Sequence, residues 1–278
     1  MPTVRPAAVA GMFYPGHAAA LAATVSQLLE DARSPQAQRA PKALIVPHAG
    51  YVYSGSTAAQ AYARLAPVRE TVRRVVLLGP VHRVPVRGLA LPGADAFATP
   101  LGRVELDRDA VAVVRQLPQV TVSAVAHAQE HSLEVQLPFL QTVLPDFQLL
   151  PLAVGDASPA EVAEVLDAVW GGLETLVVIS SDLSHFLDYD TARQVDRDTV
   201  QRMLALQGPI SHRQACGGTP VNGLLRAARR HGLQPSLLEL CNSGDTAGDR
   251  ARVVGYAALA FHEAPALSLT AAEACDAR

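Results

Sequence analysis

Histidines and an aspartate follow the ends of several apolar segments in this 278-residue chain. His48 follows LIVP, His82 follows LLGPV, and Asp182 and His185 follow VVISS. Imidazole is the commonest metal ligand in proteins, and two imidazoles with a carboxylate make an open coordination site. A metal held in this way can bind a substrate oxygen while a neighbouring histidine transfers protons. The pattern therefore predicts a metal centre, although any one of these histidines taken alone could be a structural loop residue.

Two further segments carry acids or a histidine. QEHSLEVQLPFL places Glu130 and His131 before an apolar run, with His131 and Glu134 one helical turn apart. His131 is interpreted as a metal ligand or a proton-transfer group that a neighbouring acid supports without binding the metal itself. A surface Glu–His pair is the alternative. The segment is not HExxH, so it gives no support to zinc-protease chemistry. The other segment, NSGD, places Asp245 in an acid-rich turn shortly after Cys241, and both are candidate metal ligands.

SSDLSHF and QACGGTP each permit two interpretations. Asp182 and His185 either act together, as an orienting acid with its histidine or as two metal ligands, or Ser181 or Asp182 caps the start of a helix and His185 is incidental. Cys216 is either a reactive or metal-binding thiol or, the interpretation we favour, a small buried residue beside a tight turn. Structural roles are expected for four other histidines, namely His17, His212, His231 and His262.

The elements that must position these residues alternate along the chain. Apolar segments typical of strands covered on both faces lie at 43–47, 72–79, 86–91, 147–154, 174–181, 235–241 and 252–261. Segments typical of helices lie at 17–33, 54–66, 107–116, 131–144, 158–172, 189–206 and 218–232. This alternation predicts an α/β fold, a single domain over residues 1–278 with a mainly parallel central sheet flanked by helices. In such sheets ligands bind beyond the carboxyl ends of the strands, where the candidate residues lie.

Composition excludes several classes of protein. Hydrophobic residues make up 49% and charged residues 18%, as expected for a folded globular chain. The formal charge of −3 and the absence of a Lys/Arg-rich run argue against nucleic acid as a partner. No apolar run is long enough to span a membrane, and the first residues lack the apolar segment of a signal peptide. Three cysteines without a CxxC pair indicate a reducing cytoplasm, and residues 263–278 are expected to be a flexible tail.

Seven motifs occur in the order found in the Memo family, whose bacterial and archaeal members include AmmeMemoRadiSam system protein B. They are RPAAVAGMFYPG, PHAGYVYSG, LLGPVHR, EHSLEVQLPFL, SSDLSHF, CGGTP and NSGD with RVVGYAA. The family fold is similar to that of the class III extradiol dioxygenases, which are non-haem iron enzymes. The resemblance implies a metal pocket carrying His48 and His82, with Asp182 and His185 beside it and His131 near.

The third metal ligand stays open. In animal members of the family a cysteine in the last motif completes the metal site, and counting back from VVGYAA places that cysteine at Thr246 here. Asp245, Cys241, His185 or a water molecule could take its place. A carboxylate would favour Fe(II) or Mn(II), and loss of the thiolate would weaken a preference for Cu(I).

The combined observations predict a metal-binding redox enzyme of the non-haem iron type that acts on a small molecule or a peptide. The metal is expected to be a divalent transition metal, Fe(II) in the first place, with Zn, Mn and Cu as alternatives. His185, Asp182 and His131 are the expected catalytic residues. A non-catalytic module that binds a peptide or phosphopeptide, and a metal carrier, are the alternative functions. The family name also implies a functional link to a radical-SAM protein, while neither nucleic acid nor a membrane is an expected partner.

Overall fold

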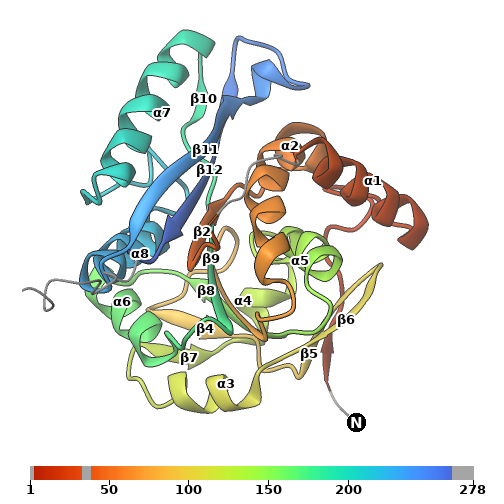
Figure 1. Ribbon diagram of the computed structural model, residues 1–278, viewed down its shortest axis with the longest axis vertical. Helices are drawn as coiled ribbons and strands as arrows, with labels where there is room; N and C mark the ends of the chain where they lie inside the picture. The colour runs from red at the N-terminus through yellow and green to blue at the C-terminus, as the bar shows by residue number, and fades with distance from the viewer. Residues whose placement is uncertain (1–2, 33–38, 265–278) are drawn as a thin grey trace, which may run out of the picture.

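The computed structural model describes residues 3–32 and 39–264. A nine-stranded mixed sheet lies at its centre (Figure 1). Its strands are β2 (Ala43–Val46), β3 (Arg74–Pro80), β4 (Leu89–Leu91), β7 (Val120–Val122), β8 (Gln148–Val154), β9 (Thr175–Ser180), β10 (His185–Leu187), β11 (Gln234–Asn242) and β12 (Val253–His262). A separate sheet of three strands joins β1 (Val4–Arg5), β5 (Ala96–Thr99) and β6 (Gly102–Glu105).

The centre of the large sheet is parallel. Its strand order is β10-β12-β2-β9-β3-β8-β4-β7, with β11 paired to β12. Strands β2, β9, β3 and β8 are parallel neighbours, whereas β12 and β4 join them in antiparallel orientation. Because Val46 pairs with Ser180 and Leu78 pairs with Ile179, the carboxyl ends of β2, β9 and β3 lie at the same edge. The predicted α/β fold with a mainly parallel sheet is confirmed.

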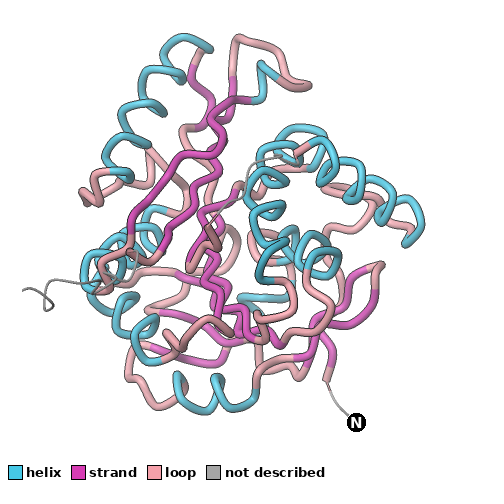
Figure 2. The backbone as a smooth tube through the Cα atoms, in the orientation of Figure 1, coloured by secondary structure: helices cyan, strands magenta, loops and turns pink. Residues whose placement is uncertain are grey.

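Helices cover both faces of the sheet (Figure 1). They are α1 (Ala18–Asp31), α2 (Tyr51–Tyr62), α3 (Arg108–Val114), α4 (Ala124–Ala128), α5 (Leu137–Val143), α6 (Pro159–Ala168), α7 (Tyr189–Leu204) and α8 (Gly218–Arg230), with 3₁₀ turns η1 (Ala63–Val68), η2 (Glu134–Gln136) and η3 (Ser243–Asp245). Helices α1, α2 and α5 pack together, and α6 packs on α8. Figure 2 shows the long β11–β12 pair running alongside α7, which contacts both strands.

Alternate side chains of each central strand enter two different cores. In β2, Leu44 and Val46 join the core beneath α1, α2 and α5, whereas Ala43 and Ile45 join the core beneath α6 and α8. Neighbouring β9 follows the same alternation, since Val178 enters the first core and Ile179 the second. Both faces are therefore apolar, which is the physical reason why these strands read as uninterrupted apolar segments.

Several element boundaries differ from the prediction. Helix α2 begins at Tyr51, directly after Gly50, and not near Ser54. Residues 131–144 do not form one helix: the η2 turn comes first and α5 begins at Leu137. Pro138 explains this, because it has no N–H to donate to the carbonyl four residues earlier. Short strands β1, β5, β6, β7 and β10 and helix α4 were not predicted, because segments of two to five residues carry little periodic signal.

Helix α6 does begin as predicted, with Ser158 accepting from the Glu161 N–H and Glu161 accepting from the Ser158 N–H. Across residues 3–32 and 39–264, no helix combines the length and apolar character that a membrane crossing requires. The predicted tail at 263–278 falls, from residue 265 onward, outside the described residues, as does Cys275. The single-domain boundary stays a prediction.

Candidate metal centre

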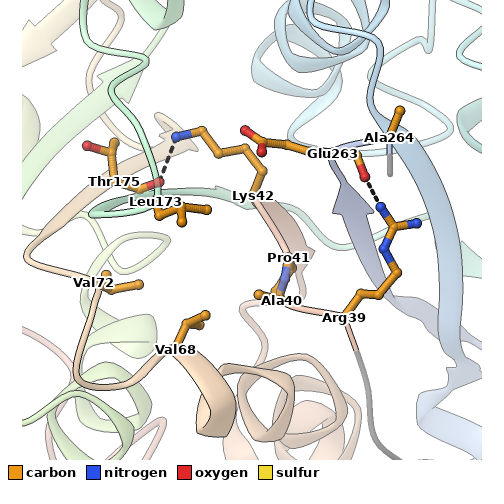
Figure 3. A pocket seen from close by; sticks show the side chains of 10 residues that line it. All are labelled: Arg39, Ala40, Pro41, Lys42, Val68, Val72, Leu173, Thr175, Glu263 and Ala264. Carbon is orange, nitrogen blue, oxygen red and sulfur yellow. Dashed lines mark hydrogen bonds between the residues drawn. The ribbon is translucent and has the colours of Figure 1, made fainter. Parts of the chain in front are cut away.

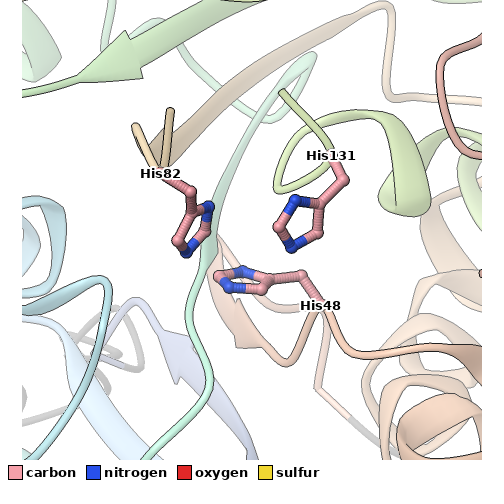
Figure 4. Close-up of side chains that lie close together, drawn as sticks. All are labelled: His48, His82 and His131. Carbon is pink, nitrogen blue, oxygen red and sulfur yellow. The ribbon is translucent and has the colours of Figure 1, made fainter. Parts of the chain in front are cut away.

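Three histidines meet beyond the carboxyl edge of the sheet (Figure 4). His48 follows β2, His82 follows β3, and His131 lies in the segment before η2. One ring nitrogen from each lies within 4.8 Å of one from each of the others. The ring centroids of His82 and His131 are 4.6 Å apart, and those of His48 lie 5.2 Å from His82 and 5.5 Å from His131. The cluster thus brings a candidate ligand pair from two strand ends together with a third imidazole.

The His48 ring is held by Ser180 at the end of β9. The Ser180 hydroxyl donates to the Ser132 carbonyl at 2.6 Å, and a carbonyl can only accept. Its oxygen also accepts from the Gln136 amide at 2.9 Å. The contact of 2.8 Å between Ser180 Oγ and His48 Nδ1 must therefore be donated by the imidazole N–H. We assign the proton of neutral His48 to Nδ1 on this network, which leaves the Nε2 lone pair free for a metal.

The His82 ring is held by a buried carboxylate. Glu130 accepts from the His82 ring at Nδ1 over 2.9 Å and from the His82 backbone N–H over 2.7 Å, and also from the Ser132 N–H over 2.9 Å. Burial raises the pKa of Glu130, but these hydrogen bonds and the charge of His82 outweigh it and lower the pKa to about 2. Glu130 is thus ionised, and a carboxylate–histidine pair of this kind orients Nε2 toward a metal.

Burial disfavours the charged form of His48 and of His131, and the neutral imidazole is the form that binds metal. Burial and the neighbouring His82 and His131 hold the pKa of His48 well below its usual range. Burial and His82 likewise lower the pKa of His131 to about 4. The aromatic ring of Phe13 lies 4.7 Å from the His131 ring and restricts its position.

Asp182 and His185 lie beside the cluster but outside the group of three. Asp182 Oδ1 accepts from the His48 backbone N–H at 2.7 Å, so this carboxylate fixes the turn that carries His48. Burial raises the pKa of Asp182 to about 6, against the opposing hydrogen bonds from the turn and the charge of His185. His185 Nδ1 donates to the Leu183 carbonyl at 2.9 Å, leaving its Nε2 available. Asp182 does not cap a helix, because α7 begins only at Tyr189 behind Asp188.

The last two candidate ligands from the sequence are not brought into this group. The Cys241 thiol lies 3.1 Å from the Thr57 hydroxyl on α2. Asp245 accepts from the Tyr189 hydroxyl and from the Asn242 N–H, so its carboxylate closes the turn that follows the carboxyl end of β11. Within the described residues, the histidine group contains neither of them.

Two contributors to the site carry a weaker sequence signal. Ser180 belongs to the VISS segment, where a small polar residue ends an apolar strand, and only the fold shows that it meets His48. Cys216, which we favoured as a structural residue, places Sγ 3.2 Å from His48 Nε2. Burial raises the pKa of the Cys216 thiol.

Other polar groups from the same segments have structural surroundings. Glu134 is buried and pairs with Arg5, and it also accepts from the Tyr14 hydroxyl and from the N–H groups of Ala8 and Val9. This network fastens the N-terminal segment to the turn that carries His131.

Among the other histidines, His231 is the C-cap of α8 and stacks on Trp170. The expected position of His231 at a helix end is therefore confirmed.

A cavity of about 280 Å³ lies at the opposite end of β2 (Figure 3). Lys42, just before β2, borders it and donates to the carbonyls of Trp170, Gly172 and Thr175 at 2.7–2.8 Å. Because this cavity is at the amino ends of the parallel strands, it is remote from the histidines at the carboxyl ends.

Comparison with known proteins gives a consistent result over nearly the whole chain. The family profile described as Memo-like protein matches residues 5–260. The chain is 36% identical over 271 residues to a MEMO1 family protein of Aquifex aeolicus, covering 93% of this chain and 99% of the relative. It is 37% identical over 279 residues to a MEMO1 family protein of Methanopyrus kandleri, covering 92% and 98%. An uncharacterized protein of Escherichia coli K12 matches in structure with a TM-score of 0.47 at 16% identity, over 80% of this chain and 99% of that one.

Proposed function

Because this chain belongs to the Memo family, we propose that its three histidines hold a divalent transition metal that serves an oxidoreductase reaction of the non-haem iron type. The observation that carries the proposal is the convergence of His48, His82 and His131 within 4.8 Å. Each of the first two rings is anchored through Nδ1, by Ser180 and by Glu130, so that Nε2 is the free donor.

The donor set fits a metal ion of this class. Three imidazoles suit Fe(II), Zn(II) and Cu(II), and the second ring nitrogens of His48 and His82 already have partners. We propose Fe(II) because the family fold resembles that of the class III extradiol dioxygenases. A bound Fe(II) would supply an electron and an open coordination position for a substrate oxygen or dioxygen. Three protein ligands leave room for such a position.

Proton transfer is assigned to the groups beside the cluster. Asp182 has a pKa raised to about 6, mainly by burial, and therefore exchanges a proton more readily near neutral pH than an ordinary aspartate. His185 keeps Nε2 free because Nδ1 donates to the Leu183 carbonyl. His185 and Asp182 would accept or deliver the proton of a substrate hydroxyl, while His131 acts as the third ligand.

The test is metal analysis of the protein purified without oxygen, together with His48→Ala, His82→Ala and His131→Ala. We expect close to one iron per chain in the parent protein and loss of iron in all three variants. His17→Ala is the matched control, since this exposed ring makes no capping hydrogen bond and lies outside the cluster. An absence of bound metal after Fe(II) and Zn(II) are offered would contradict the proposal.

A further inference from the structure

Cys216 lies against the one nitrogen of His48 that the anchoring network leaves free. Its Sγ is 3.2 Å from His48 Nε2 and 3.7 Å from the Asp182 carbonyl oxygen. His48 is only 2% exposed, and one of its ring nitrogens lies within 4.8 Å of one from each of the other two imidazoles. The thiol is therefore part of the environment of the metal centre, not an isolated cysteine.

The loop that carries Cys216 is fixed by a close approach that only glycine permits. A Cβ at Gly217 would lie 2.6 Å from Ser181 Cβ and 2.7 Å from the Ser180 carbonyl oxygen. The Gly217 N–H also donates to Ser181 Oγ at 3.0 Å. Gly217, just before α8, thus lets the loop pack onto the end of β9, and this contact sets Cys216 beside His48 and Asp182.

The proton assignment defines the contact between the two side chains. Because His48 Nδ1 carries the proton, Nε2 offers a lone pair, and the Cys216 S–H donates to it. In the metal-free protein the thiol therefore occupies the same lone pair that a metal ion requires. A metal ion that binds Nε2 therefore comes into contact with the sulfur.

The separation of the two atoms suits neighbouring ligands of one metal. Bonds of about 2.0–2.1 Å to imidazole nitrogen and about 2.3 Å to thiolate sulfur place the two donors roughly 3.1–3.5 Å apart at ligand angles of about 90–109°. The observed 3.2 Å lies within that range. Cys216 is not in the group whose atoms all lie within 4.8 Å, so binding also requires a turn about Cα–Cβ that brings the sulfur toward His82 and His131 while its distance to His48 Nε2 stays within this range.

We propose that Cys216 is a fourth protein ligand, which binds the metal as a thiolate alongside the three histidines. This inference rests on the proposed metal site. When the metal–sulfur bond forms, the S–H bond breaks and its proton leaves to solvent, while the Nε2 lone pair passes from the thiol to the metal. A thiolate adds a soft donor to three imidazoles, so Cys216 also shifts the preference of the site toward metals that accept sulfur.

Absorption spectra of the full-length protein loaded with Co(II) test this directly. Ligand-field bands in the visible report that Co(II) is bound, and a thiolate-to-Co(II) charge-transfer band in the near ultraviolet reports a sulfur ligand. We expect both in the parent protein and in the Cys241→Ser/Cys275→Ser double variant, in which Cys216 is the only cysteine. Cys216→Ser and Cys216→Ala should lose the charge-transfer band and keep visible bands.

The outcomes separate the two proposals. Visible bands without a charge-transfer band in the parent protein overturn the role of Cys216 and leave the three-histidine site intact. Loss of the charge-transfer band in the double variant, with visible bands kept, also overturns it, because the sulfur would then come from another cysteine. No visible bands in the parent protein overturn the metal site itself. Since the double variant keeps Cys216, the test does not depend on whether the Cys216 variants fold.

Discussion

Ser180 Oγ lies 2.8 Å from His48 Nδ1, and the hydroxyl proton of Ser180 is already committed to the Ser132 carbonyl. This single relationship fixes the tautomer of a buried imidazole. It also joins three parts of the chain, because β9 supplies the serine, the end of β2 supplies the histidine and the segment after His131 supplies the carbonyl. The ligand geometry is therefore a property of the sheet edge as a whole.

Ser180→Ala is expected to weaken metal binding by about 10- to 100-fold without removing a ligand. The His48 N–H, the Ser132 carbonyl and the Gln136 amide would lose a shared partner, which should also cost about 1–3 kcal/mol of unfolding free energy. Titration calorimetry with the metal measures the first effect and urea unfolding the second. Ser26→Ala, on the exposed side of α1, is the control. Unchanged affinity in Ser180→Ala would show that the His48 ring is held by other contacts.

Glu130→Gln is expected to lower metal affinity by a similar factor of about 10–100 through His82. Glutamine keeps the size of the side chain. Its amide, however, would place a second hydrogen-bond donor against the His82 backbone N–H, which Glu130 Oε2 now accepts at 2.7 Å. Metal titration checks this, with Glu70→Gln as an exposed control whose pairing with Arg69 is solvated. Affinity equal to that of the parent protein would remove Glu130 from the role assigned to it.

Glu134→Gln is expected to destabilise the fold while leaving metal stoichiometry intact. Its carboxylate is buried and pairs with Arg5, and breaking a buried pair from one side costs about 3–5 kcal/mol. Thermal unfolding and metal analysis should be made on the same samples. Glu30→Gln on the surface of α1 is the control. Loss of metal from a protein that remains folded would mean that this network acts on His131 as well as on stability.

Asp196→Asn is expected to change how stability depends on pH. Burial raises the pKa of Asp196 from 3.8 to about 6, and its Oδ2 has no partner within the described residues. Between these pH values the folded protein holds the proton more tightly than the unfolded chain, so the contribution of Asp196 is present at low pH and is lost as pH rises through 6. The loss amounts to roughly 3 kcal/mol, and the asparagine variant should not show it.

Urea unfolding of Asp196→Asn and the parent protein, at pH values below and above this range, measures the difference. The stability of the variant relative to the parent should increase with pH. Asp198→Asn, exposed on the same helix α7, is the control and should show no such trend. A pH-independent difference for Asp196→Asn would mean that the pKa of Asp196 is the same in the folded and the unfolded protein.

The sequence by itself determined the α/β fold, the central strands and the place of His48 and His82 at strand ends, and it marked His131 as a ligand or proton-transfer group without deciding between the two. The segments 43–47, 72–79 and 174–181 are recognisable because strands covered on both faces need apolar side chains at every position. His48 and His82 follow such strands directly, so their place at the carboxyl edge is a local consequence of the chain. The choice of Fe(II), the substrate and the partners stays a prediction.

Only the tertiary structure decided which further groups reach these two histidines. His131 is 49 residues after His82 in the chain. The two histidines lie side by side because Glu130, next to His131, accepts hydrogen bonds from His82. The same folding holds Asp245 and Cys241 in contacts of their own and presses the loop of Cys216 onto Ser181. Such encounters depend on long-range packing and on single hydrogen bonds, which leave no periodic pattern in the sequence.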